Sequence, residues 1–160
     1  MKLYIKQKIF SFTDKYDVYD EYGNVVFDVS SEFLSMVAKM HLNDTQGREL
    51  FYIKGKFKLF LSEYEIYKNN IICACIRQEL SFFKPRLTVD SSYGNFDIQG
   101  DFMDMDFDIY HNGQLFGSLH KKWLSWGDSY ELTIPSADNA AFFCALVIAI
   151  DNCLHNENNR

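Results

Sequence analysis

Apolar and polar residues alternate along most of this chain in a unit that recurs six times, at a spacing of 21 to 24 residues. The copies start at the apolar residues 5, 29, 53, 76, 98 and 119, and the first opens as Ile5-Lys6-Gln7-Lys8-Ile9. A second alternating stretch begins eleven residues after the start, as at Tyr16, although the fifth copy fits better with two residues deleted there. Alternation with a period of two is typical of a strand with one buried face. Every copy therefore predicts a hairpin of two strands.

Turn-forming residues separate the copies. The separating segments are Tyr22-Gly23-Asn24, Thr45-Gln46-Gly47, Asn69-Asn70, Tyr93-Gly94-Asn95 and His111-Asn112-Gly113. Gly and Asn tolerate the backbone conformations that tight turns require. Six hairpins joined by such turns predict twelve antiparallel strands.

The pattern changes once, near the end of the chain, where residues 140–150 read Ala-Ala-Phe-Phe-Cys-Ala-Leu-Val-Ile-Ala-Ile. A helix that is apolar on all sides must be surrounded by protein or lipid. These 11 residues would form a helix about 16 Å long. A helix that crosses a bilayer needs roughly 20 residues, so this one is too short. Ser136 and Asp138 precede the stretch as candidate N-caps. We therefore expect the rest of the chain to enclose this helix.

Twelve strands left as an open sheet would expose two edges, and closing the sheet removes them. A strand of five residues spans roughly 17 Å, which matches the length of the apolar helix. The sequence thus predicts a mainly β protein, a closed 12-stranded antiparallel β-barrel of six hairpin repeats around a central hydrophobic C-terminal α-helix. We expect one domain over residues 1–160, with the barrel at about 1–135 and the helix at about 137–154.

Composition and charge limit the partners and the cellular compartment that we expect. The net charge of -6 argues against general nucleic-acid binding, which leaves a basic footprint. Cys73 and Cys75 are too close along one strand to bridge, and Cys144 and Cys153 would lie on opposite faces of the helix, so reduced thiols are expected. The first residues alternate charge with apolar side chains, unlike a signal peptide. These features predict a cytoplasmic protein.

The segment Lys121-Lys122-Trp123-Leu124-Ser125-Trp126-Gly127-Asp128, followed by Tyr130-Glu131-Leu132, resembles the LURP-one-related family, as does Tyr4-Ile5-Lys6-Gln7-Lys8 near the start. That family belongs to the tubby C-terminal-like superfamily, together with the phospholipid scramblases. The resemblance covers essentially the whole chain and implies a twelve-stranded barrel around a hydrophobic helix. It also implies a role at membranes, because tubby domains bind phosphoinositide headgroups and scramblases are credited with calcium-dependent lipid movement. Of the acidic residues that form a proposed calcium site in scramblases, only Asp128, Glu131 and Asp138 are candidates here, too few for the 6–8 oxygens that Ca²⁺ takes.

Large apolar residues recur seven positions after each start, where the connections inside the hairpins meet at one mouth of the barrel. The series is Phe12, Met36, Phe60, Phe83, Met105 and Trp126. Such residues either plug the mouth over the helix end or form a rim that enters a membrane interface, where Trp and basic neighbours are favoured. The candidates for ligand or membrane binding are Phe12, Phe60, Phe83, Trp126, Lys84 and Arg86.

Charged residues fall mostly on the outward positions of the strands. Asp104, Asp106 and Asp108 would project from one strand face, either as a weak candidate for a hard-cation site or as an outward face paired with lysines. The basic residues at outward positions of first strands are Lys6, Lys8, Lys54, Lys56, Lys58, Arg77 and Lys122, and the acidic ones on second strands are Asp17, Glu65 and Glu131. They predict cross-strand ion pairs of about 0.2–1 kcal/mol each. An anionic headgroup site using two or three of the basic residues is the alternative.

Catalysis has little support, because the four histidines are dispersed and no Ser or Cys stands in a nucleophile motif. The spacing of Cys73-Ala74-Cys75 suits neither a zinc knuckle nor a redox motif. The sequence thus predicts a non-enzymatic, lipid- or protein-binding module at the cytoplasmic membrane face, with no cofactor, no metal, no nucleic-acid partner and no transmembrane segment. Anionic phospholipid headgroups or a protein are the expected partners. The alternatives are a small-molecule carrier or enzyme with a site at a barrel mouth, and a scramblase-like lipid-handling protein.

Overall fold

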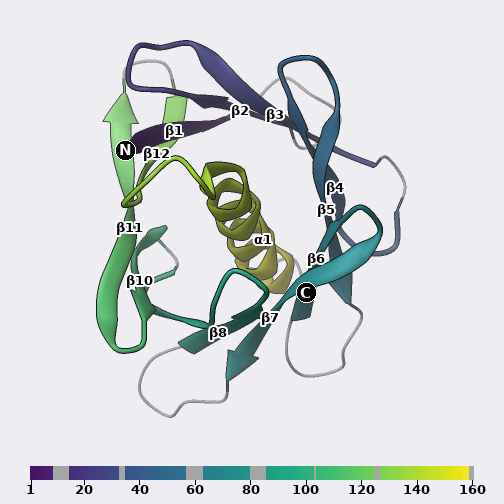
Figure 1. Ribbon diagram of the computed structural model, residues 1–160, viewed down its shortest axis with the longest axis vertical. Helices are drawn as coiled ribbons and strands as arrows, with labels where there is room; N and C mark the ends of the chain where they lie inside the picture. Colours follow the sequence, from purple (N-terminus) through teal and green to yellow (C-terminus); the bar gives the residue numbers. More distant parts are fainter. Residues whose placement is uncertain are drawn as a thin grey trace.

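The computed structural model describes residues 1–8, 15–32, 35–56, 63–79, 86–102, 104–124 and 127–158. Its strands form a closed antiparallel barrel around one C-terminal helix, which confirms the predicted fold class (Figure 1). The elements are β1 (Lys2–Gln7), β2 (Lys15–Tyr19), β3 (Val25–Ser31), β4 (Lys39–Asp44), β5 (Glu49–Lys56), β6 (Glu63–Lys68), β7 (Ile71–Glu79), β8 (Arg86–Ser91), β9 (Phe96–Asp101), β10 (Asp106–His111), β11 (Gln114–Leu124), β12 (Gly127–Thr133) and α1 (Ala140–Asn158).

The six copies interlock through one ring of buried pairs. The start residue of each copy lies opposite an apolar residue on the second strand of the copy before it. The pairs are Val29 with Tyr16, Ile53 with Met40, Ile76 with Tyr64, Ile98 with Leu87, Leu119 with Phe107, and Ile5 with Tyr130. All twelve are buried. The last pair joins β12 to β1 and closes the barrel, and the use of Phe107 confirms the two-residue deletion in the fifth copy.

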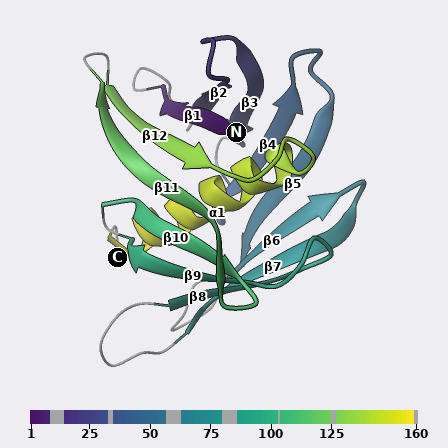
Figure 2. The ribbon, with the colours of Figure 1, turned by 60° about the vertical axis from the view of Figure 1, so that its left-hand side comes forward.

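The five predicted turns are confirmed, and they lie at one end of the barrel, named here the turn end. Asn69 and Asn70 have φ of 51° and 63°, and Asn112 and Gly113 have 50° and 75°. Two successive residues with positive φ give the two-residue hairpin turn that matches the twist of the strands. Figure 2 shows the start of α1 on the same side as the β4–β5 and β6–β7 turns, with the C-terminus at the opposite end.

The helix fills the barrel. Residues 142–153 are all buried, and their side chains form one core with the inner faces of the strands. Ser136 and Asp138 lie in the turn before the helix rather than at its cap: the Asp138 N–H donates to Ser136 Oγ at 3.4 Å, and the Ala140 N–H donates to Ala137 O at 3.1 Å. In the described part of the chain, no helix has the length and apolar character needed to cross a membrane.

Four β-bulges near the turn end add side chains to the core. In the β2–β3, β4–β5, β6–β7 and β10–β11 pairs the register skips one residue. The skipped residues are Val26, Leu50, Cys73 and Phe116, each three positions before a copy start, and all four pack against the core. A bulge lets an extra residue leave the alternation of its strand. Here that freedom supplies the added core side chains.

Candidate functional site

Most of the predicted binding residues, namely Phe12, Phe60, Phe83, Lys84 and Trp126, lie outside the described residues. Arg86 opens β8 and is exposed, with its Nη2 3.7 Å from Asp97 Oδ1 on β9. Two further residues of the apolar series predicted at the barrel mouth are described, and their exposures differ. Met36 is 99% exposed, whereas Met105 is 2% exposed and belongs to the core.

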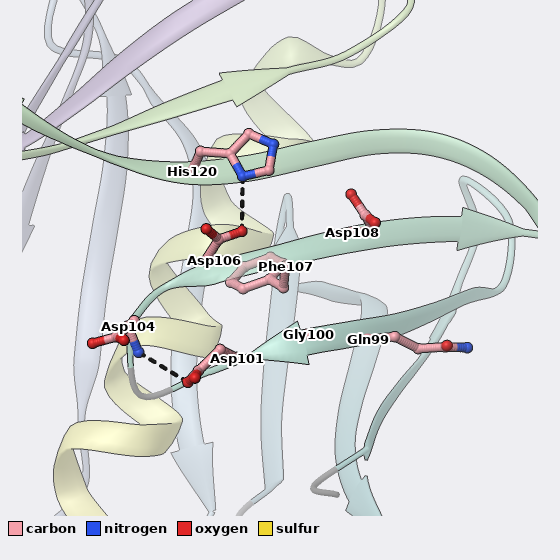
Figure 3. A pocket seen from close by; sticks show the side chains of 8 residues that line it. All are labelled: Gln99, Gly100, Asp101, Asp104, Asp106, Phe107, Asp108 and His120. Atoms are coloured by element: carbon pink, nitrogen blue, oxygen red, sulfur yellow. Dashed lines mark hydrogen bonds and ion pairs between the residues drawn. The ribbon is translucent and has the colours of Figure 1, made fainter.

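The acidic segment forms a groove of about 390 Å³ on the outer wall (Figure 3). It is lined by Gln99, Gly100, Asp101, Asp104, Asp106, Phe107, Asp108 and His120. Asp106 and Asp108 share the outward face of β10, but Asp104 lies in the preceding turn, because Met105 adopts a φ of 50° and interrupts the alternation. The expectation of three carboxylates on one strand face is therefore wrong for Asp104.

Three of the four carboxylates of this groove have partners within the protein. Asp106 Oδ1 lies 2.8 Å from His120 Nδ1, and Asp108 Oδ2 accepts the Tyr110 hydroxyl at 3.4 Å. Asp101 Oδ1 accepts the Asp104 N–H at 3.2 Å. Among the side chains that the structure describes, no group of three or more His, Cys, Asp or Glu is placed to hold a metal ion. The partners are thus a histidine, a tyrosine hydroxyl and a backbone N–H rather than the lysines that the sequence predicted.

The predicted cross-strand ion pairs are confirmed for Lys8, Lys56 and Lys122. Lys8 Nζ lies 2.8 Å from Asp17 Oδ1, and Lys56 pairs with Glu65. Glu131 bridges two lysines, with Lys2 Nζ at 3.0 Å and Lys122 Nζ at 3.7 Å. Partial burial favours a raised pKa for the Glu131 carboxyl, but the nearby lysines outweigh it and lower the pKa below 4.5. These lysines neutralise carboxylates, so they are poorly placed to recruit an anion.

A second outer-wall pocket, of about 460 Å³, lies beside β1 and β2 and is lined by Tyr4, Lys6, Tyr19, Asp20, Glu21 and Gly23. Tyr4 and Tyr19 are directly opposite in the β1–β2 register. Lys6 Nζ lies over the Tyr19 ring, 5.5 Å from its centre, and the Tyr19 hydroxyl donates to Asp17 Oδ2 at 3.3 Å. The sequence reasoning placed Lys6 outward but missed the two tyrosines. Their outward positions on adjacent strands were the available signal.

Exposed apolar side chains gather at the turn end. Five of them, named here the apolar rim, lie in the β2–β3 turn or next to the β2–β3, β6–β7 and β10–β11 turns: Tyr22 (90% exposed), Val25 (42%), Ile71 (71%), Ile72 (49%) and Leu115 (63%). The sequence reasoning missed these residues too. The signal was an apolar residue at or just after a hairpin turn, where polar residues are usual.

The described thiols are poor nucleophiles. Burial raises the pKa of Cys144 strongly, and it also raises the pKa values of Cys73 and Cys75. A thiol reacts as the thiolate, so a raised pKa lowers its reactivity at neutral pH.

Comparison with known proteins gives the family. The sequence model of the family described as LURP-one-related matches residues 1–151. The chain belongs to the LURP-one-related family. A relative in Bacillus subtilis (strain 168), named Uncharacterized protein YxjI, is 31% identical over 157 residues, which is 98% of this chain and 96% of the relative.

The LURP-one-related fold is also found in a solved structure. An X-ray structure of a protein from Arabidopsis thaliana aligns with a TM-score of 0.64 and 13% identity, covering 99% of this chain and 92% of that one. At this identity the likeness concerns the fold alone. Family membership therefore confirms the resemblance and the barrel, and the function must be argued from the surface of the barrel.

Proposed function

We propose that this LURP-one-related protein is a non-enzymatic binding module that docks reversibly on the cytoplasmic face of a membrane through the apolar rim. The observation that carries the proposal is the position of the rim residues on three separate hairpins at one end of the barrel. Exposed apolar side chains that share one end of a molecule can together contact a single partner surface. The rim lies at the turn end of the barrel. The sequence had favoured the opposite mouth, where Trp126 was expected, as the membrane-binding end.

A filled interior supports the proposal by restricting where a ligand can bind. Side chains of α1 occupy the barrel, and Tyr93 stacks on Phe142 at the turn end with ring centres 4.2 Å apart. Phe116 stacks on Phe143 at 5.1 Å. The alternative of a small-molecule carrier with a site at this mouth would require these rings to move. Binding on the outside requires no such change.

The arrangement of the rim favours a flat partner. Its residues belong to the hairpins β2–β3, β6–β7 and β10–β11, which alternate around the barrel with the other turns between them. A plane can contact all three hairpins at once. Partial burial of each aliphatic side chain contributes on the order of 1 kcal/mol, which suits weak, reversible docking.

Charge near the rim is mixed, which predicts how lipid composition affects binding. Asp20 and Glu21 lie in or beside the β2–β3 turn and Lys68 ends β6, so neither sign dominates. Attraction to anionic lipid grows with clustered basic residues. We therefore expect docking on zwitterionic vesicles, with no gain in binding when anionic lipid or Ca²⁺ is added.

Vesicle flotation tests the proposal. The wild-type protein is expected to float with zwitterionic vesicles, and the double variant Ile71→Ser, Leu115→Ser is expected to stay in the soluble fraction with an unchanged circular dichroism spectrum. Met36→Ser is the matched control, because Met36 is also exposed but lies at the opposite end. No flotation of the wild type with any vesicle, with or without anionic lipid and Ca²⁺, would overturn the proposal. Loss of flotation in Met36→Ser alone would move the contact to the other end.

A further inference from the structure

The pocket beside β1 and β2 is named here the Tyr4–Tyr19 pocket. The ligand inferred for it is a lipid headgroup, and this inference rests on the proposed membrane function. We propose that it binds a zwitterionic headgroup in which an alkylammonium cation and a phosphate are joined, as in phosphocholine and phosphoethanolamine. The tyrosine rings and the nearby carboxylates receive the cation, and Lys6 receives the phosphate.

The aromatic side of the pocket is suited to a cation. The Lys6 ammonium already lies 5.5 Å from the centre of the Tyr19 ring, so this ring face is open to a positive charge. Glu21 and Asp20 line the same pocket and add negative potential. Alkylammonium ions bind aromatic faces well, and quaternary ones are only weakly hydrated. A ligand cation can therefore take the place of the lysine ammonium.

Lys6 can then serve the phosphate. The neighbouring carboxylate, Asp17, is held by Lys8 at 2.8 Å and by the Tyr19 hydroxyl at 3.3 Å. Within the described residues Lys6 has its contact with the Tyr19 ring and no ion pair. Its four-carbon stem lets the ammonium move by a few ångströms. Displacement from the ring leaves it beside the bound cation, where a linked phosphate would lie.

The third copy contains the same pattern of residues without the same opening. Tyr52 and Tyr67 are directly opposite on β5 and β6, Lys54 follows Tyr52 by two positions, and Glu65 precedes Tyr67 by two. There the two rings contact each other at 5.7 Å, and His41 packs on Tyr52 at 5.0 Å. In the first copy the structure records no such ring contact between Tyr4 and Tyr19, and the pocket lies there. The third copy thus provides a matched control.

The location of the pocket agrees with a lipid headgroup as the ligand. Asp20, Glu21 and Gly23 belong to the connection between β2 and β3, which also carries the rim residue Tyr22. With the rim in the interface, the pocket would open close to the headgroup layer. The same chemistry could also come from a free phosphate ester, so the two sources must be separated by experiment.

Titration with soluble headgroups, followed by NMR shifts of the backbone amides, tests the pocket itself. Phosphocholine and phosphoethanolamine are expected to bind saturably and to shift the signals of Tyr4, Tyr19 and Gly23. Tyr19→Leu, Lys6→Gln and Glu21→Gln are expected to weaken phosphocholine binding, by about tenfold for Tyr19→Leu. Tyr67→Leu, in the third copy, should leave it unchanged.

Several outcomes would overturn the proposal. Absence of saturable binding at millimolar phosphocholine would do so, as would equal weakening by Tyr67→Leu. Choline binding as tightly as phosphocholine would overturn the role given to Lys6, and inorganic phosphate binding as tightly would overturn the role given to the rings. If Tyr19→Leu unfolds the protein, Glu21→Gln and Lys6→Gln, which alter only polar ends of side chains, decide the question.

Flotation separates the two sources and the two proposals. Vesicles of phosphatidylcholine or phosphatidylethanolamine should retain the protein better than vesicles of phosphatidylglycerol, which lack the ammonium group, and Tyr19→Leu should remove this preference. Rim-dependent flotation without headgroup binding would overturn the pocket and leave the membrane function standing. Headgroup binding without flotation would do the reverse and assign the pocket to a free phosphate ester.

Discussion

The same pair of groups, a tyrosine hydroxyl and a carboxylate, occurs on the two sides of the barrel wall. Inside, Tyr16 donates to Asp151 Oδ2 of α1 at 2.7 Å, and both residues are almost completely buried, at 2% and 3% exposed. Outside, Tyr67 donates to Glu65 Oε2 at 2.6 Å; the tyrosine is partly exposed, and Glu65 is 4% exposed. The geometry is alike, but the surroundings differ.

The comparison shows that the location of such a pair decides how much it contributes to the free energy of unfolding. The inner pair joins β2 to the helix, and Asn152 Nδ2 also donates to the Tyr16 hydroxyl at 3.4 Å. Water cannot replace a donor lost there without entering the core. The outer pair lies on one strand, and its carboxylate also meets Lys56. This carboxylate keeps its lysine partner when the tyrosine hydroxyl is lost, so we expect the inner wall to govern stability and the outer wall to tolerate change.

The largest expected effect comes from placing a charge inside. Ala145 is 0% exposed in α1, and Ala145→Asp should destabilise the fold by more than about 4 kcal/mol, enough to prevent accumulation of folded protein. Soluble expression and thermal unfolding measure this. Ala137→Asp is the control, since Ala137 is exposed before the helix and should be tolerated. Normal thermal stability of Ala145→Asp would contradict an enclosed helix.

A smaller effect should separate the two tyrosines directly. Tyr16→Phe should cost about 1–3 kcal/mol in the free energy of unfolding, because a buried carboxylate oxygen loses its donor. Tyr67→Phe should cost at most about 1 kcal/mol, because Glu65 keeps its ion pair with Lys56 once the hydroxyl is gone. Urea denaturation of both variants measures the difference. Equal costs would break the distinction between the inner and outer walls.

The smallest effect concerns the pH dependence of the outer pair. Burial favours a raised pKa for Glu65, but hydrogen bonds from Lys56 and Tyr67 outweigh it and lower the pKa below 4.5. A lowered folded pKa gives stability that is present above the unfolded value and is lost as the pH falls through the folded value. The free energy of unfolding of Glu65→Gln should therefore fall less steeply below about pH 4.5 than that of the wild type. A slope for Glu65→Gln equal to that of the wild type would remove this contribution.

The sequence by itself determined the barrel, its turns and the central helix, because a period of two decides which face of a strand is apolar. The start residues from Ile5 to Leu119 are all inside, as predicted. The same alternation placed Lys8, Lys56 and Lys122 outside, where they form diagonal cross-strand ion pairs with Asp17, Glu65 and Glu131.

Only the tertiary structure decided how neighbouring copies meet. The bulge residues, such as Val26 and Phe116, pack against the core because the register skips them, which alternation does not reveal. Two opposed tyrosines with a nearby lysine occur in both the first and the third copies. In the third copy, His41 from β4 packs on Tyr52, whereas in the first copy the pocket lies beside Tyr4. Periodicity assigns each side chain to a face, whereas an opening between side chains depends on the adjacent strand.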